Sequence, residues 1–345
     1  MKKTAAIISA LILLAGCGRD RASAPAESAL FRIDNAGDSV KIITFAPDGA
    51  SWDSTTVSGS ISRMICMSSS YIAYLSAIGC DSVICGVSGA KYISDTVMRR
   101  MIANGAVSDV GSDTTPDYEK ILALTPDMVV TYSMPGSDFV PNLRSLGVPV
   151  LVLNDYLASS PLGRASYIKV FGALTGKGAK ADSVFTAVSA RYEALVGKVN
   201  ADERVNVLMN IPYADSWYIP GGSNYMTRLV HDAGGDVLGA VPGKSESSVI
   251  SLEKAYILAK DADFWINTGW CDTREQLYGS NAMFSSFGIG KIYNNTLRVT
   301  PEGGNDFWES GAVRPDLILH DLISILHPDK VYGDCEGLHY YKEVQ

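Results

Sequence analysis

Two glutamates occupy the same place in a sequence motif that occurs twice in this chain. Residues 117–130 read DYEKILALTPDMVV and residues 251–266 read SLEKAYILAKDADFWI, with Glu119 and Glu253 at the matching position. Each copy predicts a capped short helix, an acidic turn and a buried strand. One copy alone would indicate only an α/β segment. Two copies predict two similar lobes, each presenting one carboxylate, which suits a partner that contacts both lobes at once.

The sequence offers no catalytic constellation. Neither a GxSxG nucleophile turn nor a GxxxxGK[ST] phosphate loop is present. The four histidines are scattered over predicted helices, a pre-proline position and the carboxy tail, so direct binding of bare zinc or manganese is not expected. They are His231, His320, His327 and His339. We predict no enzyme, no catalytic residue, no protein-bound metal and no cofactor; an exported enzyme on the same scaffold is the distant alternative.

The amino terminus predicts export and a lipid anchor. Lys2 and Lys3 precede an apolar run, residues 5–15, that is too short for a permanent membrane span and is typical of a signal peptide. The run ends in Leu14-Ala15-Gly16-Cys17, which resembles a bacterial lipobox, so Cys17 is the predicted lipidation site. The polar residues that follow suit a flexible tether. We therefore expect a periplasmic or cell-envelope protein that is held to a membrane through acylated Cys17.

Charge and cysteine content narrow the class further. The formal net charge of −8 becomes −10 once Lys2 and Lys3 are removed with the signal, which disfavours nucleic acid as a partner. After lipidation, five cysteines remain and no CxxC pair occurs, so zinc and thioredoxin-like sites are not predicted. Cys66 and Cys85 lie in apolar strand-like runs and are expected to be buried. A disulfide between Cys271 and Cys335 is possible in an oxidising compartment, but the sequence does not establish it.

The order of predicted elements gives the domain organisation. Residues 30–60 alternate like an edge hairpin, and strands then alternate with helices, which predicts a parallel sheet covered on both faces. Residues 160–200 interrupt this alternation with one long helix, a kink or break at Gly176 and Gly178, and a second helix, which we interpret as a bridge between the lobes. The predicted divisions are a signal peptide (1–16), a lipidated tether (17–30), an N-terminal lobe (31–158), a bridging helical segment (159–200), a C-terminal lobe (201–330) and a tail (331–345).

In the order and spacing of its motifs, the chain resembles the substrate-binding proteins of ABC importers for ferric siderophores, haem and cobalamin. The resemblance runs from about Arg63 to Pro328, and no single motif in it is specific. It is carried by RMICMS at 63–68, VG at 110–111 with PDYEKILAL at 116–124 and TPDMVV at 125–130, LRSLGVPVLVL at 143–153, FGALTG at 171–176 and HDAGG at 231–235. The resemblance implies an α/β fold of two Rossmann-like lobes with parallel central sheets, joined by a long bridging helix. It further implies a monomer that works with an inner-membrane permease and ATPase.

In that family one surface glutamate of each lobe docks to arginines of the permease, and Glu119 and Glu253 match those positions. Ligands of the family lie between the lobes, at the loops that follow the strands. In this chain those loops are rich in aromatic side chains and contain few cations, which suits a large multi-ring ligand. The expected ligand-binding residues are Lys91, Tyr92, Tyr132, Trp217, Tyr218, Tyr225, Trp270, Arg274, Trp308 and Arg314.

The sequence leaves the identity of the chelate open. Cobalamin-binding relatives carry a tryptophan pair at places that correspond here to Asp113 and Tyr132, so that pair is missing. An anionic ferric siderophore would need arginines, for which Arg274 and Arg314 are the candidates. Tyr92 or Tyr132 could ligate haem iron. We expect an iron chelate, either a ferric siderophore or haem, with a corrinoid as the alternative.

Overall fold

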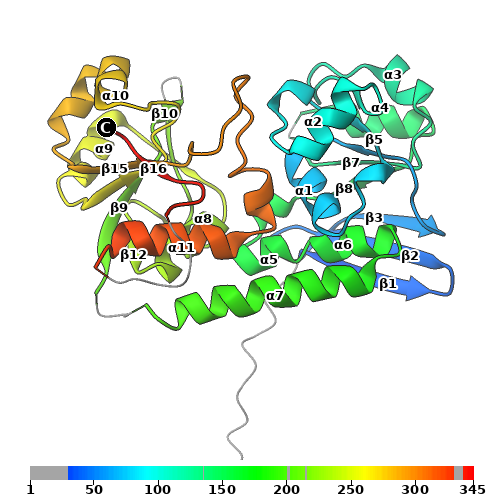
Figure 1. Ribbon diagram of the computed structural model, residues 1–345, viewed down its shortest axis with the longest axis horizontal. Helices are drawn as coiled ribbons and strands as arrows, with labels where there is room; N and C mark the ends of the chain where they lie inside the picture. The colour runs from blue at the N-terminus through cyan, green and yellow to red at the C-terminus, as the bar shows by residue number, and fades with distance from the viewer. Residues whose placement is uncertain (1–29, 135, 200–202, 214–215, 330–336) are drawn as a thin grey trace, which may run out of the picture.

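The computed structural model describes residues 30–134, 136–199, 203–213, 216–329 and 337–345. Figure 1 shows two lobes side by side, with one long helix running beneath both and a small antiparallel sheet at one end. Cys17 and Cys335 lie outside the described residues, as do the signal peptide and most of the tether. Within the described ranges, no helix combines the length and the apolar character needed to cross a membrane.

The N-terminal lobe is built on a five-stranded parallel sheet in the order β6-β5-β4-β7-β8. The central strands consist entirely of buried residues, as expected when helices cover both faces of a parallel sheet. The strands are β4 Met64–Cys66, β5 Ile84–Val87, β6 Ser108–Asp109, β7 Met128–Thr131 and β8 Val150–Val152; the helices are α1 Ser69–Ala77, α2 Thr96–Ala103, α3 Tyr118–Ala123 and α4 Phe139–Ser145. Cys66 and Cys85 are buried in this sheet, as predicted.

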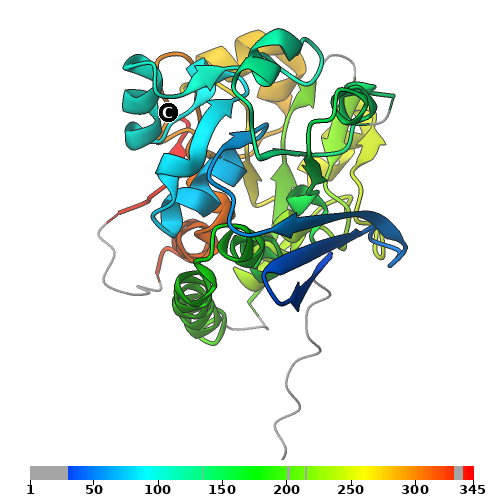
Figure 2. The same cartoon turned by 90° about the vertical axis from the view of Figure 1, so that its right-hand side faces the viewer.

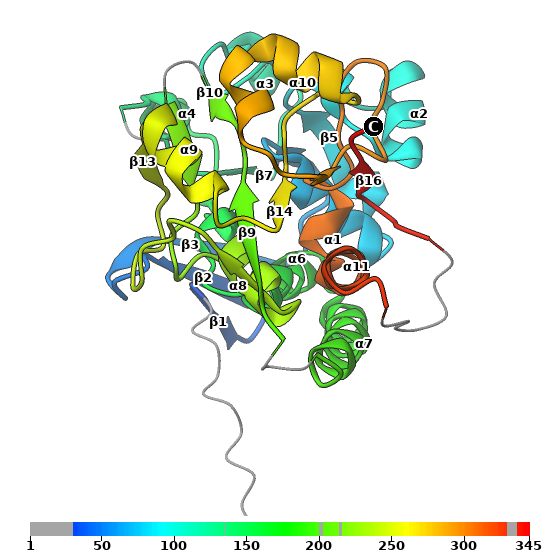
Figure 3. The same cartoon turned by 90° about the vertical axis from the view of Figure 1, so that its left-hand side faces the viewer.

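The C-terminal lobe (Figure 3) also has a five-stranded sheet, in the order β12-β9-β14-β15-β16, of which the first four strands are parallel. Its strands are β9 Val205–Met209, β12 Gly235–Val237, β14 Phe264–Ile266, β15 Lys291–Asn294 and β16 Lys342–Glu343, and its helices are α8 Tyr225–Asp232, α9 Leu252–Ala259, α10 Arg274–Ser280 and α11 Pro315–Leu326. A side sheet pairs β10 Pro212–Tyr213 and β13 Ser248–Ile250 with β11 Ser216–Ile219. The last strand, β16, runs antiparallel to β15 and comes from the tail, for which the sequence predicted no structure.

The buried carboxylate of Asp321 holds the tail in place. It accepts hydrogen bonds from the backbone N–H groups of His339 (2.8 Å), Tyr340 (2.6 Å) and Tyr341 (3.1 Å). The rings of Tyr340 and Tyr341 are fully buried in the core of the C-terminal lobe. The end of the chain is therefore part of this lobe and not an appendage.

The bridging segment differs in two respects from the expected helix, break and helix: its first helix is divided in two, and the chain turns back at the break. It forms α5 Pro161–Ala165, α6 Ile168–Leu174 and α7 Gly178–Val196, and the chain reverses between α6 and α7. Gly176 adopts a positive φ of 68° at this reversal, a conformation that glycine tolerates without strain. As a result α6 packs beside α7, and α7 extends far enough to contact α11 in the C-terminal lobe. The bridge across the two lobes is therefore α7.

An N-terminal antiparallel sheet is attached to the N-terminal lobe (Figure 2). It consists of β1 Phe31–Ala36, β2 Ser39–Phe45 and β3 Ser51–Ser58, one strand more than the predicted hairpin. The Phe31 ring packs edge-on against Tyr167 with centroids 4.8 Å apart, and Thr55 Oγ1 donates a 3.0 Å hydrogen bond to the Val150 carbonyl oxygen in β8. These contacts fix the sheet against the lobe.

Candidate functional site

The two copies of the repeated motif have the same local geometry in both lobes. The Asp117 carboxylate caps α3 by accepting from the backbone N–H of Lys120, and the Ser251 hydroxyl caps α9 by accepting from that of Lys254. Glu119 and Glu253 are each the second residue of their helix, and both are exposed. The hydrogen bond from Ser251 lowers the pKa of Glu253, so this side chain is ionised at neutral pH.

The acidic turn of each copy fixes the strand that follows. Asp127 Oδ2 accepts from the backbone N–H groups of Ser62 and Arg63, both at 2.8 Å, just before β4. Asp263 Oδ2 accepts from the backbone N–H of Asn206 at 2.8 Å, at the start of β9. The bond from Ser62 holds the pKa of Asp127 below its usual range. Each copy thus ties its helix to the neighbouring strand of its sheet, so the two glutamates occupy equivalent places.

The loops that follow β5 and β14 bring two predicted ligand residues together from opposite lobes. A side chain at Gly303 would lie 3.8 Å from Tyr92 Cε1 and 4.0 Å from Trp270 Cη2. Tyr92 is 52% exposed and Trp270 is 63% exposed. Lys91 Nζ lies 4.7 Å from the centre of the Tyr92 ring. Two exposed aromatic rings from opposite lobes and one cation therefore lie around Gly303, in the segment between β15 and α11.

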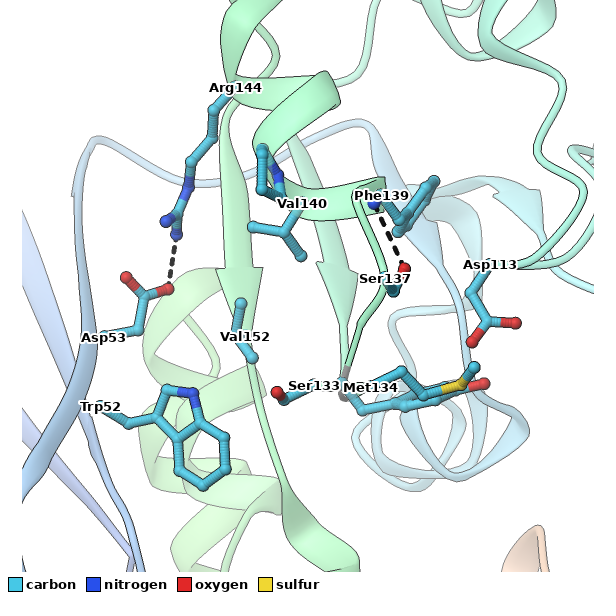
Figure 4. Close-up of a pocket in the computed structure, with 12 residues that line it drawn as sticks. Trp52, Asp53, Asp113, Ser133, Met134, Ser137, Phe139, Val140, Arg144 and Val152 are labelled. Carbon is cyan, nitrogen blue, oxygen red and sulfur yellow. Dashed lines mark hydrogen bonds and ion pairs between the residues drawn. The ribbon is translucent and has the colours of Figure 1, made fainter.

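Tyr132 belongs to a second group of residues, around a cavity of about 250 Å³ at the carboxyl ends of β7 and β8 (Figure 4). Burial, and after it the neighbouring carboxylate of Asp113, raise the pKa of Tyr132 to about 12, so its phenol is neutral at ordinary pH. The Tyr132 and Tyr156 rings make an edge-to-face contact with centroids 6.5 Å apart. The lining consists of Trp52, Asp53, Asp113, Tyr132, Ser133, Met134, Ser137, Phe139, Val140, Pro141, Arg144 and Val152.

Trp217 and Tyr225 do not fit the expected ligand role. Trp217 is only 1% exposed, stacks on Trp265 with centroids 6.0 Å apart, and donates a 2.8 Å hydrogen bond from Nε1 to the Met209 carbonyl oxygen. Side chains alternate along β11, so Trp217 enters the core while Tyr218 is exposed on the other face. The sequence indicated an aromatic cluster here but not the face on which each ring lies.

Tyr225 is part of a buried polar network that joins the lobes. Arg164 of α5 donates from Nη1 to the Tyr225 hydroxyl and from Nε to Asp155, both at 3.0 Å. Tyr74 donates to Asp155 at 3.2 Å. Asp155 and Tyr74 belong to the N-terminal lobe and Tyr225 belongs to the C-terminal lobe. Tyr225 therefore serves the junction between the lobes and not the ligand.

The two predicted arginines are both engaged within the C-terminal lobe. Arg274 donates a 2.6 Å hydrogen bond from Nη2 to the carbonyl oxygen of Gly290, at the amino end of β15. Trp270 follows the carboxyl end of the parallel strand β14, so Arg274 is directed towards the opposite end of the sheet. Arg314 makes hydrogen bonds of 2.8 and 2.9 Å with Asp316. Neither arrangement suits an arginine whose role is to bind an anionic ligand.

The segment between β15 and α11, orange in Figure 1, lies between the lobes and docks on the N-terminal lobe. Glu309, which is 2% exposed, accepts from Ser94 N (2.9 Å), Ser94 Oγ (2.9 Å) and Asp95 N (2.8 Å). Glu302 pairs with Arg99 at 3.2 Å. Burial raises the pKa of Glu309 to about 7, although these hydrogen bonds oppose the shift. Trp308, from the same segment, is 44% exposed and contacts Phe307.

Sequence reasoning missed Glu309 and Trp52. Glu309 lies in a loop without periodicity, and its partners are more than 200 residues away in the chain, so no local signal marks it. Trp52 was detectable in principle, since it begins an alternating strand pattern on an otherwise polar face. The sequence marks Asp113 only as the position where cobalamin-binding relatives carry tryptophan.

Comparison with known proteins agrees with this geometry. A family model described as "Periplasmic binding protein" matches residues 64–296. The curated protein "Uncharacterized lipoprotein MJ0878" of Methanocaldococcus jannaschii is 27% identical over 288 residues, covering 79% of this chain and 67% of its own length.

Two solved structures show the same fold. The periplasmic haem-binding protein from Pseudomonas aeruginosa has a TM-score of 0.61 at 18% identity and covers 83% of this chain and 98% of its own. The periplasmic vitamin B12-binding protein of Vibrio cholerae has a TM-score of 0.56 at 12% identity and covers 77% of this chain and 96% of its own. At these identities the likeness shows the fold alone. On the strength of the family match, the chain belongs to the periplasmic binding proteins, the two-lobed substrate-binding proteins of ABC importers, and not to a family of enzymes.

Proposed function

We propose that this protein is the substrate-binding lipoprotein of an ABC importer, which captures an iron chelate between its lobes and delivers it to the permease. The equivalent placement of Glu119 and Glu253 is the observation that carries the proposal. Both are exposed, both lie at the second position of a capped helix, and each lobe holds one. Two carboxylates in a fixed relation can steer and register a partner that carries matching arginines.

The transport step is tested by changing both glutamates to lysine. The double variant Glu119→Lys with Glu253→Lys should bind ligand normally and fail to support uptake, since each like-charge contact repels the permease. The control carries Glu193→Lys and Glu246→Lys. It changes the net charge by the same amount, at exposed positions outside the repeated motif. Normal uptake by the first variant would remove the docking assignment, and equal loss in the control would reduce it to a net-charge effect.

The aromatic side chains that are exposed in the structure support the proposed ligand-binding surface. Tyr92 and Trp270 lie near Gly303 from opposite lobes, Trp308 is exposed in the same segment as Gly303, and Tyr132 lines the cavity at the carboxyl ends of β7 and β8. Flat aromatic faces suit the rings and ligand frame of a chelate such as a ferric siderophore or haem. Tyr218 stays in the proposal as an exposed residue of β11, whereas Trp217 and Tyr225 leave it.

The engagement of Arg274 and Arg314 bears on the charge of the ligand. A strongly anionic siderophore would need cations that are committed to it, and these two side chains already contact protein oxygens. Among iron chelates, this favours one without a large negative charge. A corrinoid is the alternative that the same observation permits, although the tryptophan pair of the cobalamin-binding relatives is replaced by Asp113 and Tyr132.

Anchoring through Cys17 completes the proposed function. The lipobox at residues 14–17 supports it, and the relative from M. jannaschii carries the word lipoprotein in its name. An anchored receptor remains close to the permease in the membrane, and the polar residues of the tether would let it reach that partner.

A further inference from the structure

Tyr92 lies on a single 3₁₀ turn, Ala90–Tyr92, which follows β5 in the N-terminal lobe. The amino end of this Tyr92 turn is held by its own lobe. Asp109 Oδ2, at the end of β6, accepts a 3.0 Å hydrogen bond from the backbone N–H of Ala90. The other oxygen of Asp109 accepts from the backbone N–H of Gly111, also at 3.0 Å, so the carboxylate that holds the turn is itself fixed.

The residues just after the Tyr92 turn are held by the segment between β15 and α11, which belongs to the C-terminal lobe (Figure 1). Glu309 Oε1 accepts from the backbone N–H of Asp95, and Glu309 Oε2 accepts from that of Ser94. Gly304 of the same segment packs directly on the turn, since a Cβ atom there would lie 2.5 Å from the Tyr92 carbonyl oxygen. The Tyr92 turn is therefore fixed on its two sides by carboxylates from different lobes, both of which accept from backbone N–H groups.

These contacts hold an exposed ring in place. Tyr92 is 52% exposed, whereas the next residue, Ile93, is buried in the core of the N-terminal lobe and keeps the turn attached to it. An exposed ring contributes most to binding when its position is fixed before the ligand arrives, because ordering a mobile loop on binding costs entropy. We propose that Glu309 is a positioning residue for ligand binding, which completes the ligand surface of the N-terminal lobe by fixing Tyr92 from the C-terminal lobe. This inference rests on the proposed function and adds to it a buried residue that acts through Tyr92.

The test is a double-mutant cycle between Glu309 and Tyr92, measured as the affinity for haem and for a ferric trihydroxamate siderophore. Tyr92→Ala should weaken binding about three- to tenfold, the range for one aromatic contact. Glu309→Ala should weaken it about threefold, because both backbone N–H groups lose their acceptor and the turn loosens. Glu309→Gln keeps one acceptor oxygen and should restore part of this loss. The double variant with both alanines should bind about as weakly as Tyr92→Ala alone, since no ring is left to position.

Asp321→Ala is the matched control. Asp321 is also buried, and both of its oxygens also accept from backbone N–H groups, but those groups belong to the tail. This variant should be destabilised as Glu309→Ala is and should keep the affinity of the wild type. Circular dichroism and thermal melts show whether each variant is folded. Additive losses in the double variant, or a loss of affinity in Asp321→Ala equal to that in Glu309→Ala, overturn the positioning role.

Amide hydrogen exchange without ligand tests the same role independently. The backbone N–H groups of Ala90 and Tyr92 bond to Asp109 and to the Gly89 carbonyl oxygen, not to Glu309. Both should exchange faster in Glu309→Ala than in the wild type or in Asp321→Ala, and unchanged exchange would contradict the inference. If an iron chelate binds the wild type and Tyr92→Ala does not weaken it, the positioning role is wrong and the proposed function stands. If no iron chelate binds, both fall.

Discussion

Replacing Glu309 by glutamine tests the contact between the β15–α11 segment and the N-terminal lobe, because the stability of this contact should depend on pH. The Glu309 carboxylate is nearly inaccessible and accepts hydrogen bonds from Ser94 and Asp95, with the carboxylate of Asp306 nearby. Glu309 also lines a cavity whose other charged lining residues are Asp95, Arg191, Asp306 and Arg314. Burial raises the pKa of Glu309 from 4.5 to about 7. Glutamine does not titrate, so the change of its effect with pH reports the charge of Glu309. Because both carboxylate oxygens accept from backbone N–H groups, glutamine also leaves one donor without an acceptor, a cost of about 1–3 kcal/mol that does not depend on pH.

The sign and size follow from proton linkage. The native state holds the proton of Glu309 more tightly than the unfolded chain does, so the stability associated with this group is fully present below about pH 4.5 and is lost as the pH rises through about 7. Each pKa unit corresponds to about 1.4 kcal/mol, so the loss amounts to about 3 kcal/mol. At pH 4.5 Glu309→Gln should therefore be less stable than the wild type by the cost of the lost acceptor, about 1–3 kcal/mol. Between pH 4.5 and pH 8 the difference in unfolding free energy should shift by about 3 kcal/mol in favour of the variant.

Urea denaturation at intervals from pH 4.5 to pH 8 measures this difference, and the other titrating groups largely cancel because both proteins contain them. Glu302→Gln is the control. Glu302 lies in the same segment between β15 and α11, but it is exposed, and hydrogen bonds from its own backbone and from Arg99 lower its pKa. The control should show no gain over wild type as the pH rises. Parallel profiles for wild type and Glu309→Gln would refute the reasoning.

Three further predictions concern the anchor, the aromatic residues and the tail. Cys17→Ser should leave unprocessed precursor, whereas mass spectrometry of the wild type should show an acylated mature start; an unmodified Cys17 would disprove the anchor. Trp270→Ala should weaken chelate binding by about 1 kcal/mol with little change in stability, because its ring is open to solvent. Trp217→Ala should instead lower the unfolding free energy by about 3–5 kcal/mol, and the reverse pattern would exchange their roles. Asp321→Asn should cost about 1–3 kcal/mol and speed proteolysis of the tail, as one backbone donor loses its acceptor; an unchanged cleavage rate would contradict the role of Asp321.

The parts that the sequence predicted correctly are those with local, periodic signals. The helix caps Asp117 and Ser251 and the buried strands after Asp127 and Asp263 lie close together in the chain, so composition and spacing were enough to place them. The same holds for the break at Gly176, although the sequence did not show that the chain reverses there.

The errors arose where burial depends on distant parts of the chain. Trp217 and Tyr218 are equally aromatic, and only the packing of β11 against Trp265 decides that the first is core and the second is exposed. The sequence does not show that Tyr225 bonds to Arg164, because Arg164 lies 61 residues earlier. The tail carries no local strand signal, because its strand exists only through contacts with β15 and Asp321. Sequence periodicity does not report such contacts.

The most direct test of the proposed function is a binding titration of the purified protein with haem, cobalamin and a panel of ferric siderophores. Tryptophan fluorescence is a suitable signal, since Trp52, Trp270 and Trp308 are exposed while the remaining two tryptophans are buried. We predict that at least one iron chelate quenches this fluorescence with a micromolar or tighter dissociation constant, and that Trp270→Ala weakens its binding. Binding of cobalamin alone would replace the proposed ligand with the alternative. If no compound in the panel binds more tightly than millimolar, the proposed ligand class is wrong.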